Sequence, residues 1–197
     1  MTLMILVPIF VDELTGEGLY AVRFPEEELD EFERLFDRWA DTQKVLQYCV
    51  ANAAYLKAGH FNGQSIDQTV TRVRDEAAEL EYLLEDFSEK GFRGGDNLQM
   101  LFRPLHNRQY ELPEHQETKA KVQDQKIFPK PILRLYGIRL GKNTIVITGG
   151  AIKLTRTMDE HPDTARELEK LAEVKAFLKK NGLGNDGDLN DYYYEKF

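Results

Sequence analysis

Residues 125–158 hold the side chains best suited to chemistry, because this segment is basic and contains no aspartate or glutamate. Its seven cations are Lys126, Lys130, Arg134, Arg139, Lys142, Lys153 and Arg156. Lysine and arginine bind phosphate oxygens, so the composition favours contact with RNA or DNA. Tyr136 follows Arg134 by two residues, and alternation along a strand would place both on one face. A ring beside a phosphate-binding arginine can stack on a base.

An alternative interpretation gives the same cations a structural role. Residues 65–90 are rich in acids, and the cations of residues 125–158 could form ion pairs with them inside one domain. The acids concerned are Asp75, Glu76, Glu79, Glu81, Glu85 and Asp86. The two interpretations differ in whether the cations remain available to a ligand.

Other kinds of chemistry find little support in the sequence. The four histidines, His60, His106, His115 and His161, stand far apart, and no two have the spacing of a metal-ligand pair. Cys49 is the single cysteine, so a disulfide within the chain and a cysteine metal site are both excluded. The sequence also has no phosphate-binding glycine-rich loop and no nucleophile elbow. We therefore expect no metal and no cofactor.

The charge of the chain is unevenly distributed. The net charge of −8 argues against a general nucleic-acid binder. Residues 1–100 carry 9 lysines and arginines against 20 acids, whereas residues 101–180 carry 16 against 10. This asymmetry indicates two regions, or two faces of one domain, that have different partners.

The sequence favours a cytoplasmic protein that does not enter a membrane. No apolar run approaches the roughly 18–20 residues of a membrane span. The apolar residues 4–11 lack a basic leader and a small-residue cleavage site, which favours a strand over a signal peptide. A single cysteine fits a reducing compartment.

Apolar periodicity and capping residues predict a mixture of strands and helices. Strands are expected at 3–11, 18–24, 132–140 and 144–148, the last two joined by a tight turn. Helices are expected at 26–39, 41–56, 65–87 with Ser65 as the N-cap, 98–102, and from 163 or 164 to 181 with Thr164 and Glu167 as a capping box. Residues 104–131 are expected to be mostly loop.

These elements predict an α+β fold in which helices pack on an antiparallel sheet. We expect a core at residues 65–182, an N-terminal hairpin and helical extension at residues 1–64 that packs on it, and an aromatic, acidic tail at residues 183–197. The division follows the change in charge and the glycine-containing break at residues 59–63.

Several segments together resemble a known protein family. Residues 133–136 (Leu-Arg-Leu-Tyr), a turn and the segment 145–157 precede a capped helix, and residues 102–112 contain an upstream Tyr-Glu-Leu. This order resembles the C-terminal core of RelE/ParE-superfamily toxins, especially the HigB-like branch, over about residues 66–180. The resemblance implies a small α+β domain with two helices on an antiparallel sheet.

The resemblance also implies a function. Many members of this superfamily are ribosome-dependent mRNA endonucleases, whereas the ParE branch poisons gyrase. By position, Arg134 and Lys153 would hold the scissile phosphate, and Tyr136 would stack on a base or share in proton transfer. Further RNA-binding candidates are Arg103, Arg108, Arg139, Lys142 and Arg156, and His106 and His161 are acid/base candidates. The implied partners are a helix-turn-helix antitoxin protein and RNA or the ribosome.

Three departures from the family pattern keep a second hypothesis open. Leu154 stands where the family has the second lysine of a pair, the chain has about 60 additional N-terminal residues, and it is acidic where these toxins are basic. These differences favour a non-catalytic module that binds a protein or nucleic acid with the same fold. A third hypothesis is a homodimer or larger oligomer in which the aromatic tail from Tyr192 to Phe197 docks on a neighbour.

Overall fold

The fold is α+β, with a six-stranded mixed sheet between two layers of helices. The computed structural model describes residues 4–58, 63–106, 114–124 and 126–196. Within these residues the sheet order is β1-β2-β6-β5-β4-β3. The strands are β1 (Ile5–Val11), β2 (Gly18–Arg23), β3 (Arg103–Pro104), β4 (Gln116–Ala120), β5 (Leu133–Gly141) and β6 (Thr144–Ile152).

The sheet is mixed, whereas the sequence predicted a purely antiparallel sheet. All neighbouring strands are antiparallel except β2 and β6, which pair in parallel from Gly18 opposite Thr144 to Ala21 opposite Ile147. A parallel pair needs a long crossover connection, and here the helices between β2 and β5 supply part of it. Local patterns identify the N-terminal hairpin, but they carry no information about the distant strand beside which it lies.

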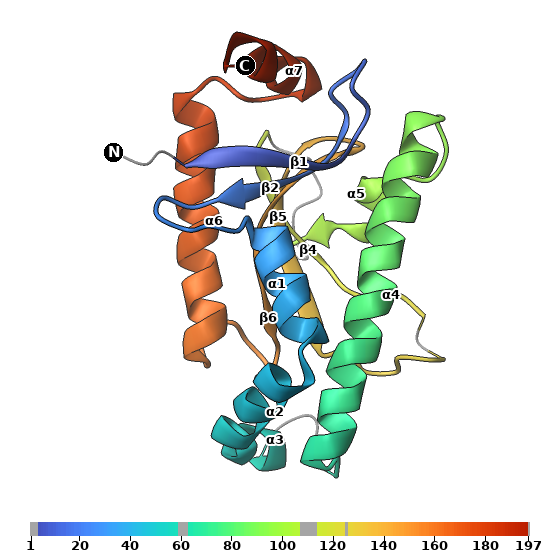
Figure 1. Ribbon diagram of the computed structural model, residues 1–197, viewed down its shortest axis with the longest axis vertical. Coiled ribbons are helices and arrows are strands. Elements are labelled where there is room, and N and C mark those ends of the chain that lie inside the picture. Colours follow the sequence, from blue (N-terminus) through green and yellow to red (C-terminus); the bar gives the residue numbers. More distant parts are fainter. Residues whose placement is uncertain (1–3, 59–62, 107–113, 125, 197) are drawn as a thin grey trace.

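Helices cover both faces of the sheet (Figure 1). The helices are α1 (Glu31–Ala40), α2 (Thr42–Ala51), α3 (Ala53–Ala58), α4 (Ile66–Phe92), α5 (Leu98–Leu101), α6 (Pro162–Lys180) and α7 (Asp186–Lys196). Helices α1 and α4 lie on one face and α6 lies on the other, while α2 and α3 lie beyond one end of α1. The expected helices and strands are present with changed bounds. The predicted helix 26–39 begins only at Glu31, because Asp30 is its N-cap, and the predicted helix 41–56 is divided at Asn52.

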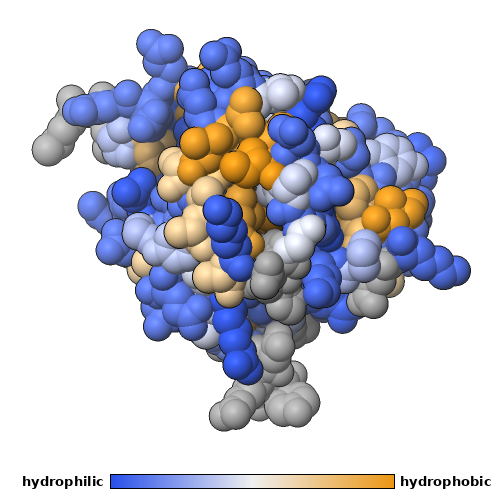
Figure 2. Space-filling model, turned by 90° about the horizontal axis from the view of Figure 1, so that it is seen from below, coloured by the Kyte–Doolittle hydropathy of each residue, from blue (hydrophilic) through white to orange (hydrophobic). Residues whose placement is uncertain are grey.

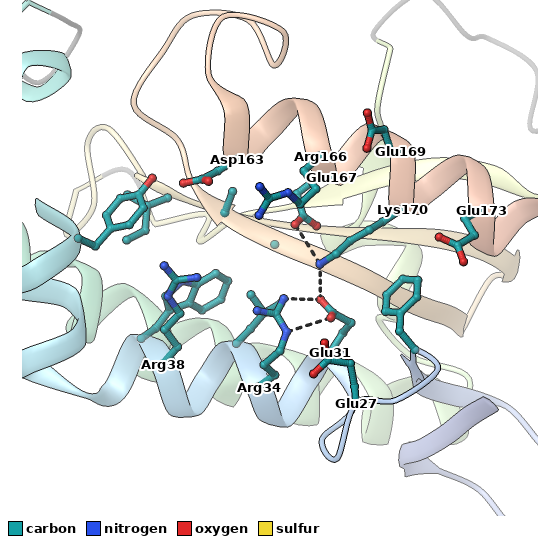
Figure 3. Close-up of a pocket in the computed structure, with 17 residues that line it drawn as sticks. Glu27, Glu31, Arg34, Arg38, Asp163, Arg166, Glu167, Glu169, Lys170 and Glu173 are labelled. Atoms are coloured by element: carbon teal, nitrogen blue, oxygen red, sulfur yellow. Dashed lines mark hydrogen bonds and ion pairs between the residues drawn. The ribbon is translucent and has the colours of Figure 1, made fainter. Parts of the chain in front are cut away.

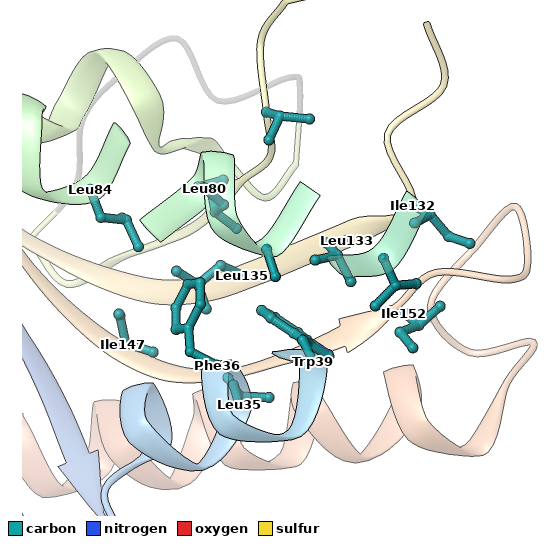
Figure 4. Close-up of a cluster of buried hydrophobic side chains, with 14 of the residues drawn as sticks. Leu35, Phe36, Trp39, Leu80, Leu84, Ile132, Leu133, Leu135, Ile147 and Ile152 are labelled. Carbon is teal, nitrogen blue, oxygen red and sulfur yellow. The ribbon is translucent and has the colours of Figure 1, made fainter. Parts of the chain in front are cut away.

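The sheet separates two hydrophobic cores. In the larger one, Leu35, Phe36 and Trp39 of α1 and Leu80 and Leu84 of α4 pack against the strands (Figure 4). The residues they meet are Ile132, immediately before β5, and Leu133, Leu135, Ile147 and Ile152 of β5 and β6. The smaller core lies under α6 and includes Leu189 of α7. Residues 1–64 and 65–182 therefore share one sheet, and both contribute to each of the two cores.

Helix starts follow the capping residues only in part. Ser65 caps α4 as predicted, and it forms a capping box with Gln68. The predicted capping box of Thr164 and Glu167 is wrong, because His161 is the N-cap of α6 and accepts a hydrogen bond from Asp163 N. Thr164 instead donates its hydroxyl to Met158 O.

The prediction of loop for residues 104–131 missed strand β4. This strand, Gln-Glu-Thr-Lys-Ala, has little intrinsic strand preference. It forms because it pairs along its whole length with β5, from Gln116 opposite Arg139 to Ala120 opposite Leu135. Pairing with a distant strand thus overrides local composition.

A buried carboxylate joins α4 to the start of β5. Glu76 has no exposed surface, and its carboxylate accepts hydrogen bonds from Ile132 N at 2.8 and 2.9 Å and from Leu133 N at 2.9 Å. Arg72 Nε donates to the same carboxylate at 3.0 Å. The carboxylate therefore fixes the backbone immediately before Arg134.

Replacing Glu76 with alanine should destabilise the fold. The substitution leaves two buried N–H groups without an acceptor, and each such group costs roughly 1–3 kcal/mol, so we expect a loss of about 3 kcal/mol in the free energy of unfolding. Urea denaturation measures this loss. Asp75→Ala, at an exposed position one residue earlier, is the control and should change stability by less than about 0.5 kcal/mol. Equal losses in the two variants would contradict the stabilising role of the Glu76 carboxylate.

Candidate functional site

Six cations line one cavity on the sheet face away from α4, which we call the cationic cavity. They come from β3, β4, β5 and the segments after β4 and β6: Arg103, Lys119, Lys121, Arg134, Lys153 and Arg156. The cavity has a volume of about 1030 Å³, and Tyr136 and His106 also line it. The structure thus brings together residues that are up to 53 positions apart in the sequence.

Strand pairing positions these side chains. Lys119 of β4 lies opposite Tyr136 of β5, and Arg134 lies opposite Ala151 of β6. The backbone N–H of Lys153 donates to Ile132 O at 2.7 Å, which holds the residue beside the start of β5. Because Arg134 and Tyr136 alternate on one strand, they lie on one face, as the sequence predicted.

Two of the cations of the cavity, Arg134 and Lys119, bond to backbone carbonyls and not to carboxylates. Arg134 Nη1 donates to Pro131 O at 2.9 Å and to Leu133 O at 2.7 Å, and Lys119 Nζ donates to Leu105 O at 2.9 Å. Within the described residues, none of the six cations has an ion pair within 4.0 Å. Their positive charge is therefore available to a ligand.

The acids of residues 65–90 do not neutralise the basic segment. Glu76 pairs with Arg72, and Asp86 pairs with Lys90, both within α4. Over the part of the chain that the structure describes, the seven cations of residues 125–158 form no ion pair with these acids. Asp159 does line the cavity, and Glu160 lies at its edge with its carboxylate on the backbone N–H groups of Arg156 and Thr157.

Burial and the repulsion of neighbouring cations lower the pKa values of the three lysines of the cavity. Burial is the larger cause for Lys119, Lys121 and Lys153, and the nearby charge of Arg134 lowers the pKa of each lysine further. For Lys153 the charges of Lys119 and Lys121 add to the effect. A bound anion would relieve this repulsion, so the cavity has the electrostatics of an anion site.

Tyr136 lies deeper than a base-stacking residue would. Its side chain is 1% exposed and belongs to the core under α6. Burial is the main cause that raises the pKa of its hydroxyl, and the charge of Glu167 contributes. The ring therefore presents no open face to a base in this structure.

The other predicted residues lie apart from the cationic cavity or outside the described residues. Arg139 Nη1 donates to Gln99 Oε1 of α5 at 3.3 Å, and Lys142 lies in the turn between β5 and β6. His161 is buried as the cap of α6, and its Nε2 is 3.0 Å from Asn52 Oδ1. Arg108 lies outside the described residues.

Sequence reasoning missed Lys119 and Lys121. Both lie in the region expected to be loop, although their alternation around Ala120 is typical of a strand with one cationic face. That pattern was the available signal.

A separate charged cavity of about 420 Å³ lies between α1 and α6 (Figure 3). Arg34 forms a two-point ion pair with Glu31, at 2.9 and 2.6 Å. Lys170 Nζ donates to Glu31 at 2.9 Å and to Glu167 at 3.1 Å, so it joins the two helices. These four charges satisfy one another, which distinguishes this cavity from the cationic cavity.

Glu167 is the unusual member of this network. It is 5% exposed, and its Oε2 has no hydrogen-bond partner among the described residues. Burial raises its pKa to about 7, although Lys170 acts in the opposite direction. The carboxylate lies over Gly149 of β6, where an added Cβ would come within 1.7 Å of Oε2.

No protein family, curated protein or solved structure matches this chain. In the described residues, no helix has the length and apolar character needed to cross a membrane. The same residues contain no group of three or more His, Cys, Asp or Glu side chains that could hold a metal ion.

Stability should fall as pH rises from about 4.5 to about 7, in part because of Glu167. Its pKa is raised in the folded protein from an ordinary value of 4.5, so the folded state binds more protons than the unfolded state between these values. The full shift corresponds to about 3 kcal/mol, which is lost above pH 7. Glu167→Gln should therefore show a smaller loss than wild type when urea unfolding at pH 5 and pH 8 is compared.

The matched control is Glu173→Gln, because Glu173 lines the same cavity from an exposed position on α6. It should keep the pH dependence of wild type. If Glu167→Gln also kept it, the buried carboxyl would not be its source.

Proposed function

We propose that this protein binds single-stranded RNA, with backbone phosphates held in the cationic cavity. One observation supports this proposal above all. Lys119, Lys121, Arg134 and Lys153 converge on one cavity, and no described carboxylate lies within ion-pair distance of any of them. Such a cluster is costly for a folded protein unless an anion occupies it.

An extended anion fits the site better than a small one. The cationic cavity continues past Arg134, Lys153 and Arg156 into an adjoining cavity of about 840 Å³. Grooves that follow a nucleic-acid backbone in this way are typical of proteins that bind single strands. The resemblance to RelE/ParE-superfamily toxins, many of which act on mRNA, supports RNA over other polyanions.

A second candidate function is RNA cleavage by a toxin of a toxin–antitoxin system. His106, an exposed imidazole, lines the same cavity as Arg134 and Lys153. In this mechanism His106 accepts the proton of a ribose 2′-hydroxyl as its oxygen attacks the adjacent phosphorus. Arg134 stabilises the charge on the phosphate oxygens, and Lys153 donates a proton to the departing 5′-oxygen. The products are a 2′,3′-cyclic phosphate and a 5′-hydroxyl.

In the toxin hypothesis, a helix-turn-helix antitoxin would be the protein partner. Such a partner would have to cover or distort the cationic cavity in order to suppress cleavage. The acidic first hundred residues, with 20 acids, offer a separate surface for it. The non-catalytic hypothesis needs neither the antitoxin nor His106.

Removing the cavity cations should weaken RNA binding. We expect Arg134→Gln and Lys153→Gln each to reduce the affinity for a fluorescent oligouridylate about 5- to 50-fold, because each loses a phosphate contact. Fluorescence anisotropy at two salt concentrations measures the affinity, and the variants should also show a weaker dependence on salt. Lys180→Gln, an exposed cation at the end of α6, is the control and should bind as wild type does. A loss with Lys180→Gln equal to that with Arg134→Gln would contradict a localised site.

Growth assays separate cleavage from binding alone. If the protein is a toxin nuclease, its expression should arrest bacterial growth and shorten cellular mRNA, and both effects should disappear in His106→Ala. Lys180→Gln should remain as toxic as wild type. Normal growth and intact mRNA, together with RNA binding by the purified protein, would reject the nuclease and leave the binding function.

A further inference from the structure

Tyr55 lies at the end of the groove that leaves the cationic cavity. The adjoining cavity is lined by Tyr55 and Ala58 of α3 and shares Lys121, Arg134, Lys153 and Arg156 with the cationic cavity. Lys130 adds a further cation to its wall. The groove therefore runs from the phosphate-binding cations to an aromatic ring on a helix of the N-terminal region.

A buried histidine holds this ring in place. The rings of Tyr55 and His161 meet edge to face, with centroids 4.7 Å apart and planes at 67°. His161 is itself fixed, because its Nε2 bonds to Asn52 Oδ1 at 3.0 Å and its Nδ1 accepts from Asp163 N at 3.2 Å. Tyr55 nevertheless keeps 39% of its surface exposed. Its ring is thus both supported from one side and open on another.

Among the described residues, Tyr55 and Tyr136 are the Phe, Tyr or Trp side chains that line these two cavities. Tyr136 is buried, so it cannot receive a base without a rearrangement. Tyr55 therefore takes the place in which the sequence had suggested Tyr136. A base stacked on a preformed ring loses little entropy, and such stacking is sequence-tolerant.

We propose that Tyr55 is a base-stacking residue and that the ligand is single-stranded RNA, with an unpaired base on Tyr55 and adjacent phosphates on Arg134 and Lys153. This inference rests on the proposed RNA-binding function and makes it more specific. A duplex would not suit the groove, because its bases are already stacked on one another. The stacking residue belongs to the helical extension, which the resembling toxins do not share.

Exposed apolar residues near Tyr55 offer a competing explanation. Leu46 and Val50 of α2 are 38% and 58% exposed, and apolar surface occupies the end of the molecule where α2 and α3 lie (Figure 2). If Tyr55 only contributed to a protein-docking surface, Val50 would matter as much as Tyr55. Val50 does not line either cavity, so it supplies a matched control.

The test compares Tyr55→Ala, Tyr55→Phe and Val50→Ser in binding to three probes. The probes are an oligouridylate, an abasic oligomer of the same length, and inorganic polyphosphate. We expect Tyr55→Ala to weaken oligouridylate binding roughly 5- to 150-fold, the range for one stacked base, and to leave the other two probes within about twofold of wild type. Tyr55→Phe keeps the ring and should retain oligouridylate binding, as should Val50→Ser.

A fluorescent base reports stacking directly. An oligonucleotide that carries 2-aminopurine should lose fluorescence when it binds wild type or Tyr55→Phe, and should lose much less when it binds Tyr55→Ala at saturation. Urea denaturation of each variant checks that the fold is kept. If Tyr55→Ala proves unstable, Tyr55→Leu, which keeps an apolar contact with His161 but has no ring, replaces it.

The outcomes separate this inference from the proposed function. If oligouridylate binding depends on Arg134 but not on Tyr55, stacking on Tyr55 is wrong while RNA binding stands. If Tyr55→Ala weakens the abasic oligomer as much as the oligouridylate, or if Val50→Ser has the same effect, stacking is also wrong. If wild type binds neither RNA nor polyphosphate, the proposed function itself fails.

Discussion

The hydrogen bonds to the buried carboxylate of Glu76 are the interaction on which the position of the cationic cavity depends. It accepts the N–H groups of Ile132 and Leu133, and Ile132 O in turn accepts Lys153 N. Ile132, the residue immediately before β5, is thereby held on both sides, by α4 and by the segment that leaves β6. Because Arg134 lies two residues further on, these bonds fix the backbone of Arg134 relative to that of Lys153.

The buried acids have cationic or N–H partners, whereas the cations of the cationic cavity have no carboxylate partner among the described residues. The buried acids are committed to other partners: Glu76 to backbone N–H groups and Arg72, and Glu31 and Glu167 to the cations between α1 and α6. In the cationic cavity, Lys119 and Arg134 bond to carbonyl oxygens, which bind a positive charge but do not neutralise it. The pKa values of Lys119, Lys121 and Lys153 are lowered because burial and repulsion both disfavour the charged forms. This repulsion between cations is unfavourable for folding, and binding of an anion would relieve it.

The sequence predicted what local patterns determine and missed what distant pairing determines. The hairpin of β5 and β6 and the Ser65 cap follow from neighbouring residues, and so does the shared face of Arg134 and Tyr136. The parallel pairing of β2 with β6 has no local signal, and the strand that carries Lys119 has only the short alternation around Ala120. His161 has the residue type of a proton shuttle, yet its Nδ1 caps α6 and its Nε2 bonds to Asn52, more than a hundred residues away. Tyr136 is likewise buried, so its ring offers no face on which a base could stack.

The net negative charge of the chain is compatible with a cationic groove, and it affects which polyanions could approach that groove. A uniformly basic protein attracts any polyanion over its whole surface, whereas a net charge of −8 repels polyanions except where positive potential is concentrated. Under the proposed function, a ligand would bind where the positive charge is concentrated, and a flexible single strand would enter the groove more readily than a rigid duplex. Under the proposed function, the acidic first half would repel polyanions and the basic hairpin would bind them, so that together they would favour single strands over duplexes.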